Sequence, residues 1–413
     1  MRQVARGIMY ITEDCVGMRR RHTRQRGLLL RAVSTMVALL GLGSVSNCAD
    51  STSPVPWRDT SDVLVVANEP PTIDAISLPG GATTRLPLSH TTDVAALDAS
   101  GTVLLTSGPG GGDLTATSVT TGRTLWSERL STTFAPRLDR WNGIIIGGQA
   151  GLAETGDGTA LFIGPAFADS VTGTEGVAIL DSRTRDLRAF VAPFFLEARG
   201  VAAVPAKDGA PAAMAMVGRR ERYPTIVDDW LYIVDAIRFT IIDSTHVDLT
   251  PGSQHPRPLY MPQYNSAVST LYLVQGGAIP CLVAVGWPSL TVEASVCDPA
   301  FRVFALSPDG TLVALFRKAD WTTELVQYDA LLHERNRLNL GRDPDSGLPA
   351  LGQDVAVSRT AAQAFVIAGT GSIVLDEPGP QRGQLYVIDV VSWQIAHIVP
   401  LGLFSPKQVF GVR

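Results

Sequence analysis

One unit of strand-like segments recurs along most of the chain, and a recurring unit constrains the fold more than any single motif does. The unit consists of a short apolar segment, a Gly-containing turn, a strongly apolar segment, a loop, a segment that ends in Asp and an amphipathic segment. Its clearest copy spans residues 301–341. The Asp that ends the third segment recurs as Asp181, Asp235, Asp329 and Asp389. Successive members of this series are 54, 94 and 60 residues apart, and the spacing of 94 equals two periods of 47.

The pattern within the unit predicts a β-propeller and not a β-sandwich. The second segment is apolar throughout, as in residues 311–316, which is expected of a strand that neighbouring blades cover on both faces. The fourth segment alternates and carries charge, as in residues 335–340, which is expected of an outer strand with one wet face. Residues 329–338 would also suit a short helix. Propeller blades repeat at roughly 40 to 50 residues, so loops hold the excess length.

Both ends of the repeating region hold an incomplete unit. Residues 62–88 lack the first apolar segment, and residues 407–412 form such a segment without the rest of a unit. Pairing the two completes a ring and removes a pair of exposed strand edges. The sequence therefore predicts an all-β fold of seven four-stranded antiparallel blades, closed by the C-terminal strand joining the N-terminal blade.

Short motifs in these units resemble a known superfamily. Residues 307–310 (Ser-Pro-Asp-Gly) and the segments that end in Asp resemble the YVTN-type and WD-repeat-like β-propellers. Residues 121–126 are similar to one quinoprotein-type repeat. The resemblance covers about residues 60–413. It implies the fold, and it transfers no catalytic residue.

Residues 1–47 have the pattern of a secretory signal. A basic region up to Arg31 precedes 14 residues of apolar character, 32–45, and small residues follow at Ser44 and Ser46. A bilayer span needs about 20 apolar residues, so a transmembrane anchor is the less favoured alternative. Residues 1–17 lack signal character, and Met18 would make a better start.

Residues 45–48 are similar to a bacterial lipoprotein box, in which the cysteine becomes the lipidated first residue. Cys48 is therefore the lipidation candidate. The lipoprotein pattern has Gly, Ala or Ser where this chain has Asn47, and ordinary cleavage near Ser46 is the alternative. Residues 48–60 are then expected to form a tether, and residues 61–413 a single propeller domain.

Two cysteines remain in the predicted domain, Cys281 and Cys297. They flank an expected hairpin with strands at 281–285 and 290–296, and their midpoint falls in the turn. Opposed residues on antiparallel strands have Cα atoms about 4.5 to 5.5 Å apart, which a disulfide can bridge. The pair predicts a disulfide and an oxidising compartment, and two buried thiols in a reducing cytosol are the alternative.

The charge distribution excludes two classes of partner. The chain has a formal net charge of -5, but residues 1–47 carry +6, which leaves -11 for the remainder. An acidic body without a basic stripe argues against nucleic-acid binding. It also argues against electrostatic docking onto anionic lipid, so membrane attachment is expected only through an N-terminal lipid anchor.

The sequence contains no convincing chemical motif. Its histidines lack metal-ligand spacing, and the Gly-rich run at 108–112 lacks the Lys and Ser/Thr of a phosphate loop. Residues 343–347 lack the distal Glu of a calcium loop. Asp228 and Asp229 are interpreted as an exposed turn and not as an acid–base pair. No catalytic, cofactor-binding or metal-binding residue is predicted, and no cofactor.

The function predicted is that of an exported, monomeric binding module at the cell envelope, periplasmic or on the outer side and lipid-anchored if Cys48 is modified. Its partner would be an unknown envelope protein or a small ligand, contacted through insertions at 132–142, 219–228 and 248–258. The alternative is a propeller enzyme, lactonase-like or another hydrolase, with a site at one end of the axis. A role like that of propeller lipoproteins in outer-membrane assembly rests on fold analogy alone.

Overall fold

The computed structural model describes residues 62–68, 71–108, 113–130, 132, 143–145, 151–169, 175–207, 210–222, 226–247, 259–307, 309–342, 347–370, 382–403 and 406–412. The predicted signal segment, the tether and Cys48 lie outside these residues. The described residues belong to one compact unit, which is built of antiparallel β-strands. None of the described residues forms a helix long and apolar enough to cross a bilayer.

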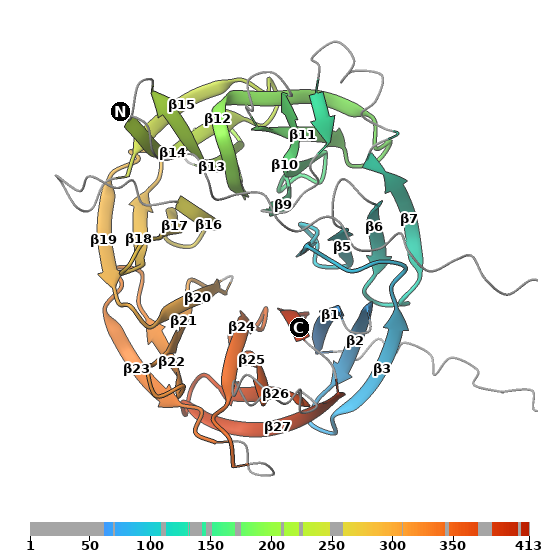
Figure 1. Cartoon of the computed structure of the whole chain (residues 1–413), viewed down its shortest axis with the longest axis vertical. Coiled ribbons are helices and arrows are strands. Elements are labelled where there is room, and N and C mark those ends of the chain that lie inside the picture. Colours follow the sequence, from blue (N-terminus) through green and yellow to red (C-terminus); the bar gives the residue numbers. More distant parts are fainter. Residues whose placement is uncertain are drawn as a thin grey trace, which may run out of the picture. The chain divides into compact units, whose positions relative to one another are not determined.

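Seven four-stranded blades surround a common axis (Figure 1). From the axis outwards, blade one is β28 (Pro406–Gly411), β1 (Val63–Asn68), β2 (Pro71–Ser77) and β3 (Ala82–Pro87), and blade two is β4 (Val94–Leu97), β5 (Val103–Ser107), β6 (Asp113–Ser118) and β7 (Thr124–Arg129). Blade three is β9 (Gly151–Glu154), β10 (Ala160–Asp169), β11 (Glu175–Asp181) and the first part of β12 (Leu187–Val204). Blade four is the second part of β12, then β13 (Ala213–Arg222), β14 (Ile226–Asp235) and β15 (Ile241–His246).

The remaining blades follow the same order. Blade five is β16 (Leu259–Asn265), β17 (Thr270–Gln275), β18 (Cys281–Gly286) and β19 (Val292–Cys297), and blade six is β20 (Phe301–Leu306), β21 (Leu312–Arg317), β22 (Thr323–Tyr328) and β23 (Glu334–Asn339). Blade seven is β24 (Leu351–Val357), β25 (Gln363–Thr370), β26 (Arg382–Asp389) and β27 (Gln394–Leu403). The seven-bladed ring expected from the repeating unit is thereby confirmed.

Burial follows the position of a strand within its blade. Every residue of β17 and of β18 is buried, because neighbouring blades cover both faces of these middle strands. The outermost strand β23 is exposed at five of its six positions, with Leu338 half-buried. The segment 329–338 is thus a turn followed by a strand, and its interpretation as a short helix is wrong.

The two ends of the domain meet in blade one. β28 pairs antiparallel with β1, with Val409 opposite Val65, and the Val412 N–H donates to the Asp62 carbonyl at 2.9 Å. Val409 is buried in a cluster that includes Phe365 of blade seven. The C-terminal strand therefore joins the first blade to the last, as the incomplete units at both ends predict.

Blades three and four share one strand. β12 pairs with β11 at Val191 and with β13 at Val201, so both blades belong to one eight-stranded sheet that also includes β8 (Gly143–Ile145).

The hairpin β13–β14 is longer than predicted. Its pairing continues to Arg222 opposite Ile226, so the insertion expected at 219–228 is mostly strand. Asp228 and Asp229 lie within β14, opposite Arg220 and Arg219, so the prediction of a turn at this pair is wrong. The sequence pattern of one strand alone does not show how far its pairing with the next strand continues. Residues 133–142, 248–258, 109–112 and 343–346 lie outside the described residues.

Candidate functional site

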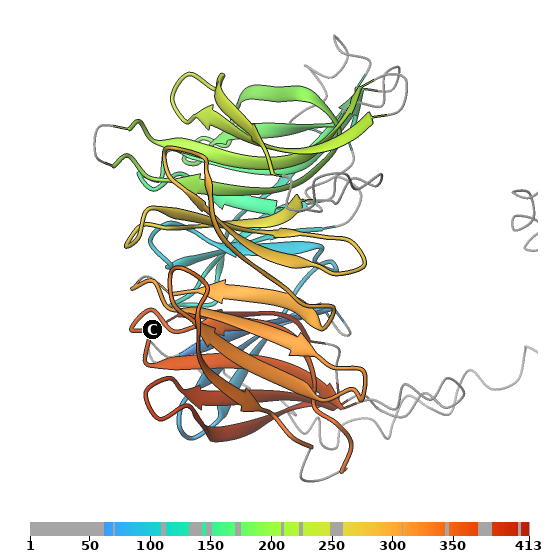
Figure 2. The same cartoon turned by 90° about the vertical axis from the view of Figure 1, so that its left-hand side faces the viewer.

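The ring has two different faces (Figure 2). On one, here called the turn face, lie the connections from the first to the second strand and from the third to the fourth strand of each blade. On the other, here called the loop face, lie the connections from the second to the third strand and from each blade to the next. The two faces are therefore described separately below.

The connections between third and fourth strands are capped locally. The Asp235 carboxylate accepts the N–H groups of Ile237 and Arg238, both at 2.8 Å, and these bonds hold the pKa of Asp235 below its usual value. The Asp389 carboxylate likewise accepts the Ser392 N–H at 2.7 Å, which lowers its pKa. The Asp that recurs at the end of the third segment is therefore a turn cap and not a catalytic group.

Side chains also tie the turn face together near the axis. The Arg359 guanidinium of blade seven donates to the Ser100 carbonyl of blade two at 2.6 Å, so the bond joins the two blades that flank blade one. Lys207 of blade four donates to the Ser266 carbonyl of blade five at 2.6 Å. These bonds fix the inner connections of the turn face to one another, so this face is interpreted as structural.

The loop face differs because the innermost strands of five blades contain β-bulges close to it. In blade six, Phe301 lies opposite Phe316 and Val303 opposite Leu315, which leaves Arg302 without a partner position. The other residues left over in this way are Gln353 in β24, Lys407 in β28, Met261 with Pro262 in β16, and Arg199 in β12. A bulge re-aims the extra side chain, and bulges are over-represented near functional sites.

Three bulged residues present long side chains to solvent. Arg302 and Gln353 are exposed, and Met261 is 40% exposed with a φ of 53°. A positive φ is unusual for a non-glycine residue and is retained only where the surroundings enforce it. The innermost strands of blades five to seven therefore offer cationic, amide and thioether groups at the loop face.

Exposed apolar side chains also lie on this face. Trp321, in the connection between β21 and β22, is 46% exposed, and Ile279, between β17 and β18, is 44% exposed. Trp, Met and Arg are the residue types enriched where proteins bind one another. The described part of the loop face over blades five to seven has the composition of a contact surface.

Two arginines meet where blade six adjoins blade seven. Arg317, the last residue of β21, donates from Nη2 to the Gly352 carbonyl of β24 at 2.6 Å. Burial lowers the pKa of Arg317, and the nearby charge of Arg302 lowers it further. Among the described residues neither arginine forms an ion pair, although the overall charge of the domain is negative.

Lys407 and Asp354 lie at the seam between blades seven and one. The Lys407 ammonium is 3.9 Å from an Asp93 carboxylate oxygen, and burial lowers the pKa of Lys407. Asp354 Oδ2 accepts the Val409 N–H at 2.9 Å, and burial raises the pKa of Asp354 to about 7.

Asp354 is expected to make the stability of the ring depend on pH. A carboxyl with a higher pKa in the folded than in the unfolded chain stabilises the fold at low pH, and this contribution is lost as pH rises through about 7. Asp354→Asn keeps an acceptor for Val409 and cannot ionise. We expect it to stabilise the protein by about 1 to 2 kcal/mol at pH 8, with the gain shrinking as pH falls toward 4.

Thermal unfolding midpoints measured across this pH range check the expectation. Asp389→Asn is the control, because the pKa of Asp389 is lowered and its replacement should give no gain at pH 8. A gain from Asp354→Asn that is the same at both ends of the range would contradict the role assigned to this carboxyl.

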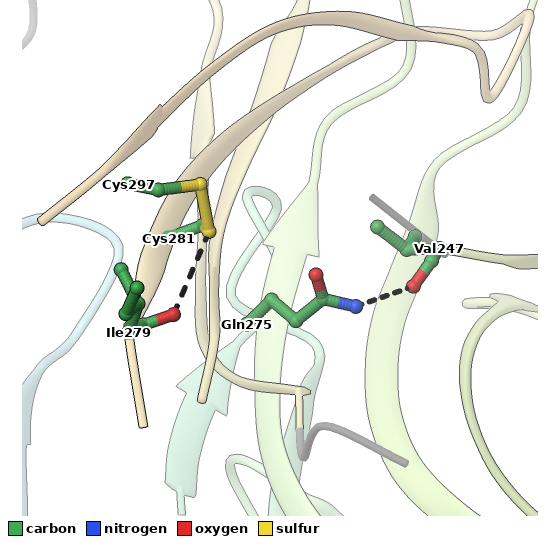
Figure 3. Close-up of a disulfide and its surroundings, with 5 residues drawn as sticks. All are labelled: Val247, Gln275, Ile279, Cys281 and Cys297. Carbon is green, nitrogen blue, oxygen red and sulfur yellow. Dashed lines mark hydrogen bonds between the residues drawn. A yellow bond between two sulfur atoms is a disulfide. The ribbon is translucent and has the colours of Figure 1, made fainter. Parts of the chain in front are cut away.

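The predicted cysteine pair forms a disulfide in blade five (Figure 3). Cys281 of β18 lies directly opposite Cys297 of β19, and their Cα atoms are 4.0 Å apart. Cys281 is buried and Cys297 is exposed, at the end of the blade nearest the loop face. Close by, the Gln275 side chain donates to the Val247 carbonyl at 2.7 Å and so links blade five to blade four.

The described residues contain no group of three His, Cys, Asp or Glu side chains placed to hold a metal ion. The sequence pattern did not identify Arg302, Gln353 or Met261 as site candidates. The one signal in it is a long polar or flexible residue near the start of the first segments of blades five, six and seven.

Neither the family models nor the curated proteins compared with the sequence give a match. Solved structures do. A functionally unknown protein from Desulfotomaculum acetoxidans is 13% identical, with a TM-score of 0.54 over 85% of this chain and 98% of that one.

Two further structures show the same fold. The β-propeller domain of Cps50 (Swd1) from Myceliophteria thermophila is 11% identical, with a TM-score of 0.52 over 78% of this chain and 90% of that one. Hydrazine synthase from Kuenenia stuttgartiensis is 10% identical, with a TM-score of 0.52 over 87% of this chain and 100% of that one. At these identities the likeness concerns the fold alone. The chain is a seven-bladed β-propeller.

Proposed function

We propose that this propeller is a binding module that contacts its partner through the loop face over blades five to seven. The observation that carries the proposal is the set of bulged, solvent-exposed residues on the innermost strands, Met261, Arg302 and Gln353. Bulges hold these side chains on rigid strands, where binding costs less ordering than it does on a loop. Trp321 and Ile279 add exposed apolar area to the same face.

The proposal includes export to the cell envelope, with Cys48 as the lipid-anchored residue. The Cys281–Cys297 disulfide supports export, since disulfides persist in oxidising compartments and are rare in the cytosol. The signal-like pattern of residues 1–47 supports it independently. Fractionation of cells that express the full chain tests this part, and recovery of the protein in the cytosol would overturn it.

A cross-linked pull-down from envelope extracts tests the binding role. We expect the full chain to recover a specific partner and Trp321→Ala to lose most of it, since truncation of a central aromatic anchor typically costs more than 1 kcal/mol. Val391→Ala is the matched control, because Val391 is 89% exposed but lies on the turn face, between β26 and β27. Loss of the partner with Val391→Ala and its retention with Trp321→Ala would refute the assignment of the face.

A further inference from the structure

We propose that Arg302 and Arg317 form a subsite on the loop face, between blades six and seven, that binds an oxyanion: a carboxylate or phosphate group of the ligand. The inference rests on the binding role proposed above, and it assigns the charge of what that face binds. Four observations carry it, each from the described residues around β20, β21 and β24.

The Arg317 side chain is held in place, but one of its N–H groups lacks an acceptor among the described residues. Its Nη2 donates to the Gly352 carbonyl at 2.6 Å, and the backbone approaches closely there, since a Cβ on Gly352 would lie 2.7 Å from Leu315. Its Nε is buried and has no hydrogen-bond partner among the described residues. A buried N–H without an acceptor is costly, and a bound oxyanion would supply that acceptor.

Arg302 brings a second positive charge to the same place. The bulge in β20 turns its side chain outward, and Nη1 donates to the carbonyls of Pro299 and Phe301 at 3.1 and 2.7 Å. These two bonds occupy one nitrogen of a guanidinium that has five N–H groups. The remaining donors of Arg302 bond to none of the described residues, and the side chain is exposed.

Blade six pairs its other cations with carboxylates. Arg337 donates to Glu324 and to Glu334 at 2.6 Å, and Lys318 also pairs with Glu324. By contrast, neither Arg302 nor Arg317 has a carboxylate within ion-pair distance among the described residues. Two neighbouring guanidinium groups without a counter-charge repel each other, and an anion between them removes that cost.

The surroundings complete a recognition site. Gln353, the bulged residue of β24, directly follows the Gly352 that Arg317 contacts, and it is exposed. Its amide can donate to an oxygen atom, while Trp321 offers an apolar surface on the same face. Guanidinium groups match the planar fork of a carboxylate and the oxygens of a phosphate better than other cations do.

Isothermal titration calorimetry tests the subsite. The purified propeller is titrated with inorganic phosphate and, separately, with succinate, at constant ionic strength. We expect saturable binding of at least one of the two, about tenfold weaker in Arg302→Gln. The probe that binds more tightly shows whether the ligand's oxyanion is a phosphate or a carboxylate. Arg317→Lys is the second variant, since it keeps the charge and removes Nε, and it should weaken binding without unfolding the protein.

Arg335→Gln is the matched control, because Arg335 lies in the same blade on the outer strand, paired with Asp329 at 2.8 Å. It should bind both probes as tightly as the unchanged protein does. Absence of binding in the unchanged protein, or equal affinity in Arg302→Gln and Arg335→Gln, would overturn the subsite. That failure would leave the Trp321→Ala pull-down unaffected, so the binding role and the oxyanion subsite are refuted by different results.

Discussion

Replacing Gly411 by alanine is expected to destabilise the propeller by about 2 to 4 kcal/mol. A Cβ at this position would lie 2.5 Å from the Val357 carbonyl oxygen and 2.9 Å from the Ser358 Cα. Both are backbone atoms of blade seven, which cannot rotate away as the end of a side chain can. β28 would have to move off β24, and the bond from the Val409 N–H to Asp354 would weaken with it.

The midpoint of thermal unfolding measures this effect, with Gly80→Ala as the control. Gly80 lies in the turn between β2 and β3, and a Cβ there meets no atom within 4 Å. Its replacement should leave the midpoint unchanged or raise it slightly, because alanine restricts the unfolded chain. Equal midpoints for the two variants would show that the approach of blade one to blade seven is looser than described.

Reduction of the Cys281–Cys297 disulfide is expected to cost about 3 kcal/mol, as the loop-closure model gives for a loop of this length. The midpoint of thermal unfolding should therefore fall on addition of dithiothreitol. A double variant, Cys281→Ala with Cys297→Ala, should unfold at the lower midpoint whether or not the reductant is present. An unchanged midpoint in protein shown by mass spectrometry to be reduced would contradict the expected stabilisation.

The seven-bladed ring could be predicted because the burial pattern that produces it recurs from blade to blade. Burial on both faces makes the middle strands continuously apolar, as in β21, and exposure makes the outer strands polar, as in β23. The Asp capping of the third strand depends on bonds within five residues, so the same residue pattern marks this turn in blades three, four, six and seven. The disulfide followed from symmetric spacing about a hairpin turn.

The candidate site was not predictable in the same way. A bulge adds one residue to an innermost strand. Apolar and polar residues do not alternate strictly in innermost strands such as β20 and β24, so the added residue cannot be recognised in the sequence. The neighbourhood of Arg302 and Arg317 depends on how β20 and β21 pair and on how blade six packs against blade seven, which involves residues far apart in the sequence. The signal segment, lipidation of Cys48, the monomeric state and the enzyme alternative stay predictions.

The strand β12 also limits how this ring can deform. One continuous strand forms the outermost strand of blade three and the innermost strand of blade four. These two blades therefore belong to one sheet and cannot easily move relative to each other. The other blades are separate sheets, linked by connecting segments and by packing. Under strain the ring should therefore yield first where β28 closes it, because β28 and β1 are joined by hydrogen bonds and packing and not by a connecting segment, while blades three and four move together.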